Sequence, residues 1–161
     1  MPGILHARAA ERHFTFTRPP VAPGLTPFAE HYWVVRWDLT GRDPYEQWVL
    51  PYPSVNITFT AGRCRVAGVP RGRFSEVLSG AGRVFGVRFR PGGFQPFSPA
   101  PVSALTGRFV PLAELFGDRG RRLADDVLVA HDAGAAAALD AFLLSFEPRR
   151  NGAAERTSWP A

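Results

Sequence analysis

Residues 80–97, GAGRVFGVRFRPGGFQPF, constrain the fold of this chain more than any other segment. Side chains alternate between the two faces of a β-strand, so residues 84–90 place Phe85, Val87 and Phe89 on one face. The opposite face carries valine, glycine and arginine. The Pro-Gly-Gly that follows ends the strand, because proline lacks the donor that a central strand needs. The segment therefore predicts a strand inside a sheet, with its aromatic face buried.

Similar alternating patterns recur up to residue 90, separated by turn signals at a spacing of roughly 8–12 residues. This spacing favours an antiparallel barrel or sandwich, because parallel strands need longer crossover connections. The predicted strands are residues 13–17, 32–39, 46–50, 55–60, 63–67, 74–78 and 84–90.

Beyond residue 101 the apolar periodicity becomes helical. Residues 118–129 and 133–146 are predicted helices, the second capped by Asp132. The second helix carries an apolar stripe that either docks on the sheets or pairs with a second copy of the chain in a homodimer. This candidate interface consists of Leu139, Phe142, Leu143 and Phe146. The predicted fold class is α+β: an antiparallel β-barrel or sandwich, cupin-like in outline, followed by C-terminal helices.

The composition indicates a globular protein, with 45% hydrophobic residues, and the single cysteine fits the reducing cytoplasm. No apolar run reaches the length of about 20 residues that spans a bilayer, and the first residues lack a secretory signal, so we expect no membrane partner. The single cysteine, Cys64, excludes an intramolecular disulfide. Its neighbours Arg63 and Arg65 would lower the pKa of its thiol, whereas the alternative interpretation is an ordinary strand residue.

All 19 basic residues are arginines, and the net charge is +5. A positive charge suits nucleic-acid binding, which depends on contacts with phosphates. The arginines are scattered along the chain rather than clustered. We therefore expect no direct DNA binding by this segment.

Residues suited to catalysis or metal binding are sparse. No metal-ligand spacing is found among the four histidines, His6, His13, His31 and His131, which predicts no metal. No serine or cysteine lies in a nucleophile motif with a base partner. We therefore predict no catalytic residue, no cofactor and no enzymatic activity.

A small-molecule pocket is the remaining candidate site, because such pockets are mostly apolar with a few placed polar groups. Arg36 and Arg88 would bind a carboxylate bidentately if both face a cavity. The alternative places these arginines in water, paired with Asp38 and Glu46. The candidate ligand-binding residues are Trp33, Arg36, Trp37, Trp48, Tyr52, Asn56, Arg88 and Arg90.

Four segments carry a resemblance to a known family: HYWVVRWDL, LPYPSVNITF, GAGRVFGVRFRPGGFQPF and PVSALTGRFVPLAELFG. In this order they resemble the N-terminal domain of bacterial AraC-type transcriptional regulators. The resemblance implies a non-enzymatic regulatory domain that senses a small-molecule effector or dimerises. DNA would then be contacted only through a helix-turn-helix domain, which no segment of this chain resembles.

The predicted organisation is an extended N-terminal arm at residues 1–27, a regulatory domain with its helices at 28–147, and a linker or tail at 148–161. Two other functions stay open at this point. One is a small barrel enzyme that holds an anionic substrate with Arg88 or Arg90. The other is a protein-interaction module that uses the apolar stripe of the last helix.

Overall fold

The computed structural model describes residues 12–50 and 52–149. The strands are β1 (Thr15–Thr17), β2 (Ala29–Asp38), β3 (Tyr45–Val49), β4 (Asn56–Thr60), β5 (Arg63–Ala67), β6 (Phe74–Leu78), β7 (Ala81–Phe89) and β8 (Phe109–Pro111). The helices are α2 (Leu112–Phe116), α3 (Asp118–Val129) and α4 (Asp132–Leu144), with 3-10 turns η1 (Pro23–Leu25), η2 (Gln95–Phe97) and η3 (Val102–Leu105). Residues 1–11 of the predicted arm and 150–161 of the predicted tail lie outside the described residues.

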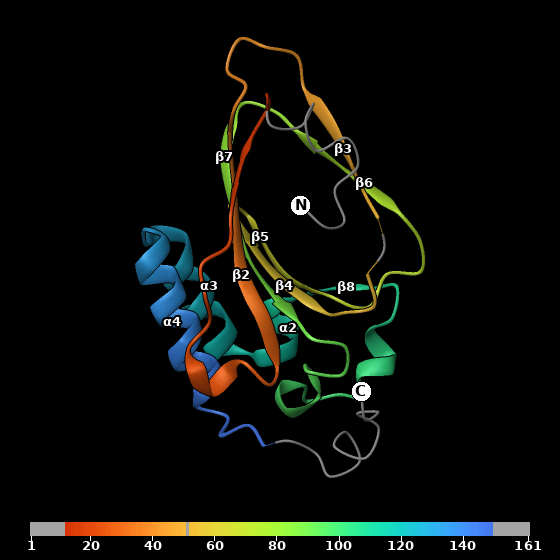
Figure 1. Ribbon diagram of the computed structural model, residues 1–161, viewed down its shortest axis with the longest axis vertical. Helices are drawn as coiled ribbons and strands as arrows, with labels where there is room; N and C mark the ends of the chain where they lie inside the picture. The colour runs from red at the N-terminus through yellow and green to blue at the C-terminus, as the bar shows by residue number, and fades with distance from the viewer. Residues whose placement is uncertain (1–11, 51, 150–161) are drawn as a thin grey trace.

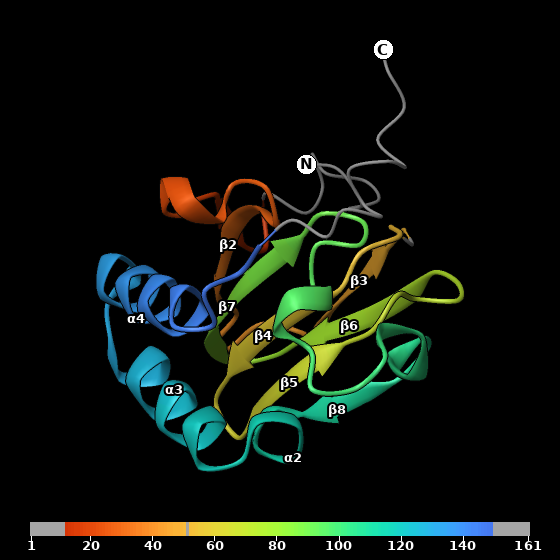
Figure 2. The ribbon, with the colours of Figure 1, turned by 90° about the horizontal axis from the view of Figure 1, so that it is seen from below.

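The strands form a six-stranded antiparallel sheet, in the order β1-β2-β7-β4-β5-β8, and a two-stranded ribbon of β3 and β6. The ribbon lies opposite one face of the large sheet, and helices α3 and α4 cover the other face (Figures 1 and 2). The α+β class with antiparallel sheets and C-terminal helices is confirmed. Among the described residues the strands form two separate sheets rather than one closed barrel.

The predicted strands 63–67 and 74–78 are observed without change, and the strand predicted at 84–90 is β7. It begins earlier, because β2 is long enough to pair with it as far as Ala81, opposite Asp38. The sequence pattern missed β8, whose three residues end in a proline at the edge of the sheet. Proline is tolerated there because an edge strand does not need every donor.

The main hydrophobic core lies between the large sheet and the helices. Phe85, Val87 and Phe89 are fully buried on the helix side of β7, as the alternation predicts. They pack in one cluster with Leu123 and Val127 of α3. Because the apolar face of β7 packs against the helices, the opposite face of the strand points toward the β3–β6 ribbon.

The apolar stripe of α4 docks on its own chain. Leu139 and Leu143 are fully buried, and Phe142 is nearly so. Phe146 packs edge-on against Phe97, with 5.7 Å between the ring centroids. Of the two predicted arrangements for this stripe, the structure has the docked one.

The start of α4 differs from the prediction. His131, not Asp132, is the N-cap, and its Nδ1 accepts a hydrogen bond of 3.1 Å from the backbone N–H of Gly134. Asp132 is the first residue of the helix, so its carboxylate is free for a contact with the sheet.

No helix in the described part of the chain has the length and apolar character needed to cross a membrane.

Candidate functional site

A cavity of about 730 Å³ lies between the large sheet and the β3–β6 ribbon. This volume is in the range of about 300–1,000 Å³ that is usual for small-molecule sites. Five of the eight candidate ligand-binding residues line it: Trp33, Trp37, Tyr52, Asn56 and Arg88. Strands β2, β4 and β7 bring four of them together, because these three strands are neighbours in the sheet, and Tyr52 comes from the connection between β3 and β4.

Two tryptophans on β2 lie flat over two glycines on β7. Trp33 is paired with Gly86, and Trp37 with Gly82. A Cβ atom at Gly86 would lie 2.2 Å from the Trp33 indole, and one at Gly82 would lie 2.4 Å from that of Trp37. Glycine is therefore required at both positions, because no side chain fits beneath the rings. The sequence contains a signal for this pairing, because the two tryptophans and the two glycines have the same four-residue spacing.

Each indole is also fixed by a hydrogen bond. Trp33 Nε1 donates to Asn56 Oδ1 over 3.1 Å, and Trp37 Nε1 donates to the Ser79 carbonyl oxygen over 3.0 Å. Buried or half-buried indoles usually find such an acceptor, which sets the orientation of the ring. The floor of the cavity is thus a pair of positioned aromatic rings.

Arg88 enters the cavity wall from β7 with only 12% of its side chain exposed. Its Nε lies 3.4 Å from a carboxylate oxygen of Glu30, and its guanidinium carbon lies 3.4 Å from the centroid of the Tyr52 ring. The Tyr52 hydroxyl donates to the other oxygen of Glu30 over 2.8 Å, which raises the pKa of Tyr52. Nε has no hydrogen-bond acceptor among the described residues. Glu30 and Tyr52 thus hold the guanidinium of Arg88 in place, but they leave its Nε donor without an acceptor.

His31 lines the same cavity. Its Nδ1 lies 2.9 Å from the Tyr32 carbonyl oxygen, so Nδ1 carries the proton in the neutral ring. Burial lowers the pKa of His31, and the charges of Arg18 and Arg88 lower it further. The lowered pKa favours the neutral form of the imidazole at pH 7.

The lining is strongly basic. It contains one carboxylate, Glu76, and six arginines: Arg18, Arg63, Arg65, Arg71, Arg88 and Arg108. Glu76 is shared by Arg65 at 3.2 Å and Arg63 at 3.3 Å. The excess of positive charge favours anionic ligands over cations.

Cys64 does not have the lowered pKa that its arginine neighbours suggest. Burial raises the pKa of the thiol, because the thiolate is the form that desolvation penalises. The interpretation as an ordinary strand residue is the one that this shift favours. Within the described residues no group of three or more His, Cys, Asp or Glu side chains has the arrangement of a metal site.

Comparison with known proteins identifies the domain that contains this cavity. The family described as "Domain of unknown function (DUF6597)" matches residues 17–111. The chain belongs to the DUF6597 family. No curated protein and no solved structure matches the chain significantly. The DUF6597 segment runs from the end of β1 to the end of β8, so it contains nearly all of both sheets and most of the cavity lining.

Three predicted site residues of the DUF6597 segment lie outside the cavity. Arg90, an exposed residue directly after β7, donates from Nε to the Thr26 carbonyl oxygen over 2.7 Å. Trp48 is 42% exposed, and the Arg73 guanidinium lies 5.5 Å from the centroid of its ring. Arg36 faces the helices instead, so the expectation that it and Arg88 share a ligand is wrong. The two residues lie on opposite faces of the sheet, because Arg36 pairs with Arg83 and Arg88 with His31 in the register of β2 and β7.

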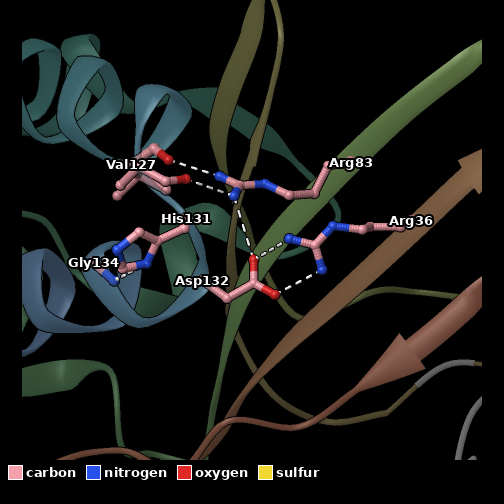
Figure 3. A network of polar contacts seen from close by, with 7 residues as sticks. Arg36, Arg83, Val127, His131, Asp132 and Gly134 are labelled. Carbon is pink, nitrogen blue, oxygen red and sulfur yellow. Dashed lines mark hydrogen bonds and ion pairs between the residues drawn. The ribbon is translucent and has the colours of Figure 1, made fainter.

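Arg36 joins the DUF6597 sheet to the last helix, and it pairs with neither Asp38 nor Glu46. Its two terminal nitrogens donate to both oxygens of Asp132, at 2.6 and 2.5 Å (Figure 3). Arg83 lies 3.3 Å from the same carboxylate and also donates to the carbonyl oxygens of Val127 and Ala130, at 2.7 and 2.8 Å. The hydrogen bonds from Arg36 lower the pKa of Asp132. We call Arg36, Arg83 and Asp132 the helix clamp.

Proposed function

We propose that this chain is the effector-sensing domain of an AraC-like transcriptional regulator in the cytoplasm, without catalytic activity. In this proposal a small molecule binds in the cavity of the DUF6597 sheets, and DNA is contacted only through a separate helix-turn-helix domain. The observation that carries the proposal is the cavity itself, about 730 Å³ with an indole floor and a basic wall. The sequence resemblance supplies the regulatory context.

The geometry supports a path from the cavity to the last helix. On β2, Trp33 and Trp37 face the cavity, whereas Arg36 between them faces α4. The hydroxyl of Tyr32, also on β2, donates to Asp140 of α4 over 2.6 Å. A ligand that shifts the indole floor therefore moves a strand that holds α4 at two points. Helix α4 is the last helix of the described chain and leads toward its C-terminal end (Figure 1).

A thermal-shift screen with a variant that obstructs the cavity floor tests the proposal. A ligand that binds only the folded state raises the melting temperature. Thr58 lines the cavity opposite Gly86, so Thr58→Trp places a large ring on the cavity floor beside Trp33, whereas Thr40→Trp adds the same ring at an exposed turn. We expect ligands from a library of small metabolites to stabilise the wild type and Thr40→Trp, but not Thr58→Trp. The proposal fails if no compound stabilises the wild type, or if Thr58→Trp responds equally.

A specific observation also favours the enzyme alternative: the neutral His31 lies in the same cavity as Arg88. A neutral imidazole beside a bound anion is a candidate general base. Mass spectrometry of a stabilising ligand after incubation separates the two functions. A sensor returns the ligand unchanged, and an enzyme converts it at a rate that His31→Gln reduces.

The dimerisation and protein-interaction alternatives have less support. Both use the apolar stripe of α4, whose central residues Leu139 and Leu143 are fully buried in the chain's own core. A partner could reach them only if α4 left the sheet.

A further inference from the structure

We propose that the ligand of the cavity is a flat organic acid. Its carboxylate is bound by Arg88, and its planar apolar body lies on the indole floor formed by Trp33 and Trp37. This inference rests on the proposed sensing function and adds the chemical class of the effector.

The hydrogen-bond donors of Arg88 are incompletely satisfied, because Nε has no acceptor in the described part of the chain although Glu30 lies near it. A guanidinium has five N–H donors, and burying such a charge is unfavourable unless the donors find acceptors. One oxygen of Glu30 lies 3.4 Å from Nε without forming a hydrogen bond with it, and the other oxygen accepts a hydrogen bond from Tyr52. The Tyr52 ring covers one face of the guanidinium and the buried Nε lies beside Glu30, so the terminal N–H groups are the donors left for a ligand. A planar carboxylate matches these donors through two parallel hydrogen bonds.

A second buried polar group belongs to the lining of the same cavity. Ser54 lines the cavity and is only 2% exposed, yet its Oγ has no hydrogen-bond partner in the described part of the chain. Ser54 lies two residues before Asn56, which is paired with Arg88 across β4 and β7. A hydroxyl of this kind can donate to a carboxylate oxygen held by the guanidinium.

The indole floor favours a ligand with a flat shape. Because Gly86 and Gly82 carry no side chain, the two indoles lie down on the sheet and present broad aromatic surfaces. A third ring, that of Phe16, lies parallel to Trp33, with an angle of 3° between the ring planes and 6.5 Å between the centroids. Aromatic rings stack on such surfaces with a gain beyond that from buried area alone. The single carboxylate of the lining, against six arginines, disfavours a cationic body.

Three probes separate the parts of this inference: 2-naphthoate (flat and anionic), 2-naphthamide (flat and neutral) and octanoate (anionic but not flat). Binding of each is measured by isothermal titration calorimetry to the whole chain at physiological salt. We expect 2-naphthoate to bind at least about tenfold more tightly than the other two, the gain expected of a charge-assisted hydrogen-bonded pair.

Arg88→Met keeps the apolar stem and removes the charge. It should abolish the preference for 2-naphthoate over 2-naphthamide while leaving 2-naphthamide binding within about twofold of the wild type. Arg90→Met is the matched control, because Arg90 lies two residues further along the chain but outside the cavity. It should bind all three probes as the wild type does.

The comparison of probes on the wild type decides the inference even if Arg88→Met does not fold. Equal binding of 2-naphthamide shows that the acid is not recognised, and equal binding of octanoate shows that a flat body is not required. Absence of binding by all three probes also overturns the inference. None of these results overturns the sensing function, which the response of Thr58→Trp to the metabolite library decides separately.

Discussion

Asp132→Asn removes the negative charge of the helix clamp and keeps the size of the side chain. The carboxylate accepts two hydrogen bonds from Arg36 and lies 3.3 Å from Arg83. The two arginines are directly opposite each other on β2 and β7, an arrangement that is unfavourable without an anion between them. In the variant both positive charges stay and their shared partner is lost.

The size of the effect follows from the exposure of the three side chains. Hydrogen bonds to charged groups contribute about 1.5–3 kcal/mol, but exposed ion pairs contribute only about 0–1 kcal/mol. Arg36 is 45% exposed, Asp132 29% and Arg83 19%, so the clamp lies between these limits. We expect Asp132→Asn to lower the free energy of unfolding by about 1–2 kcal/mol at pH 7. For a chain of this length the melting temperature should fall by about 2–8 °C.

The loss should depend on pH in a defined direction. The folded-state pKa of Asp132 is lowered, mainly by the hydrogen bonds from Arg36. The stabilisation by the carboxylate is therefore complete above its unfolded-state pKa of about 4, and it disappears as the pH falls through the lower folded-state pKa. The difference between wild type and variant should be constant from pH 7 to about pH 5 and should shrink below about pH 4.

Urea unfolding followed by tryptophan fluorescence at pH 7, pH 5 and pH 3 measures this difference. Asp118→Asn is the matched control, because Asp118 is also the first residue of a helix and also pairs with an arginine, but is 75% exposed. Its substitution should cost less than about 0.5 kcal/mol. If Asp132→Asn costs no more than Asp118→Asn, or costs as much at pH 3 as at pH 7, the clamp does not hold α4 as we infer.

Further predictions concern the core, the floor of the cavity, the thiol and DNA. Phe85→Ala should cost about 3–5 kcal/mol in urea unfolding, because Phe85 is fully buried, whereas Val129→Ala at 86% exposure should change stability by less than about 0.5 kcal/mol. Gly86→Ala should displace the indole above it and shift the tryptophan emission, whereas Gly72→Ala, where the added atom meets nothing within 4 Å, should not. Cys64 should react with iodoacetamide at pH 8 several-fold more slowly in the folded chain than in urea, since burial raises the pKa of its thiol; equal rates contradict this. Fluorescence anisotropy should detect no sequence-selective DNA binding by this chain at physiological salt, and sub-micromolar binding would refute the expectation.

The sequence alone was sufficient for features that depend on neighbours along the chain. Strand alternation has a period of two, so it identified β5 and β6 residue for residue and placed Phe85, Val87 and Phe89 on one buried face. The apolar spacing that marks a helix identified α3 with the bounds that the structure has. These patterns depend only on residues close together in the chain, and the tertiary contacts stabilise the same strands and helix that the patterns predict.

Tertiary structure decided which polar residues share a site. Alternation divides each strand into two faces, but it does not say which face the helices cover or how one strand is shifted against the next. Arg36 and Arg88 were equivalent candidates on that basis. The register of β2 against β7 determines that Arg88 lines the cavity and that Arg36 lies on the opposite face, where it pairs with Asp132. The same register lays Trp33 on Gly86. Pairing register and strand order depend on contacts between residues far apart in the chain, so no local pattern contains them.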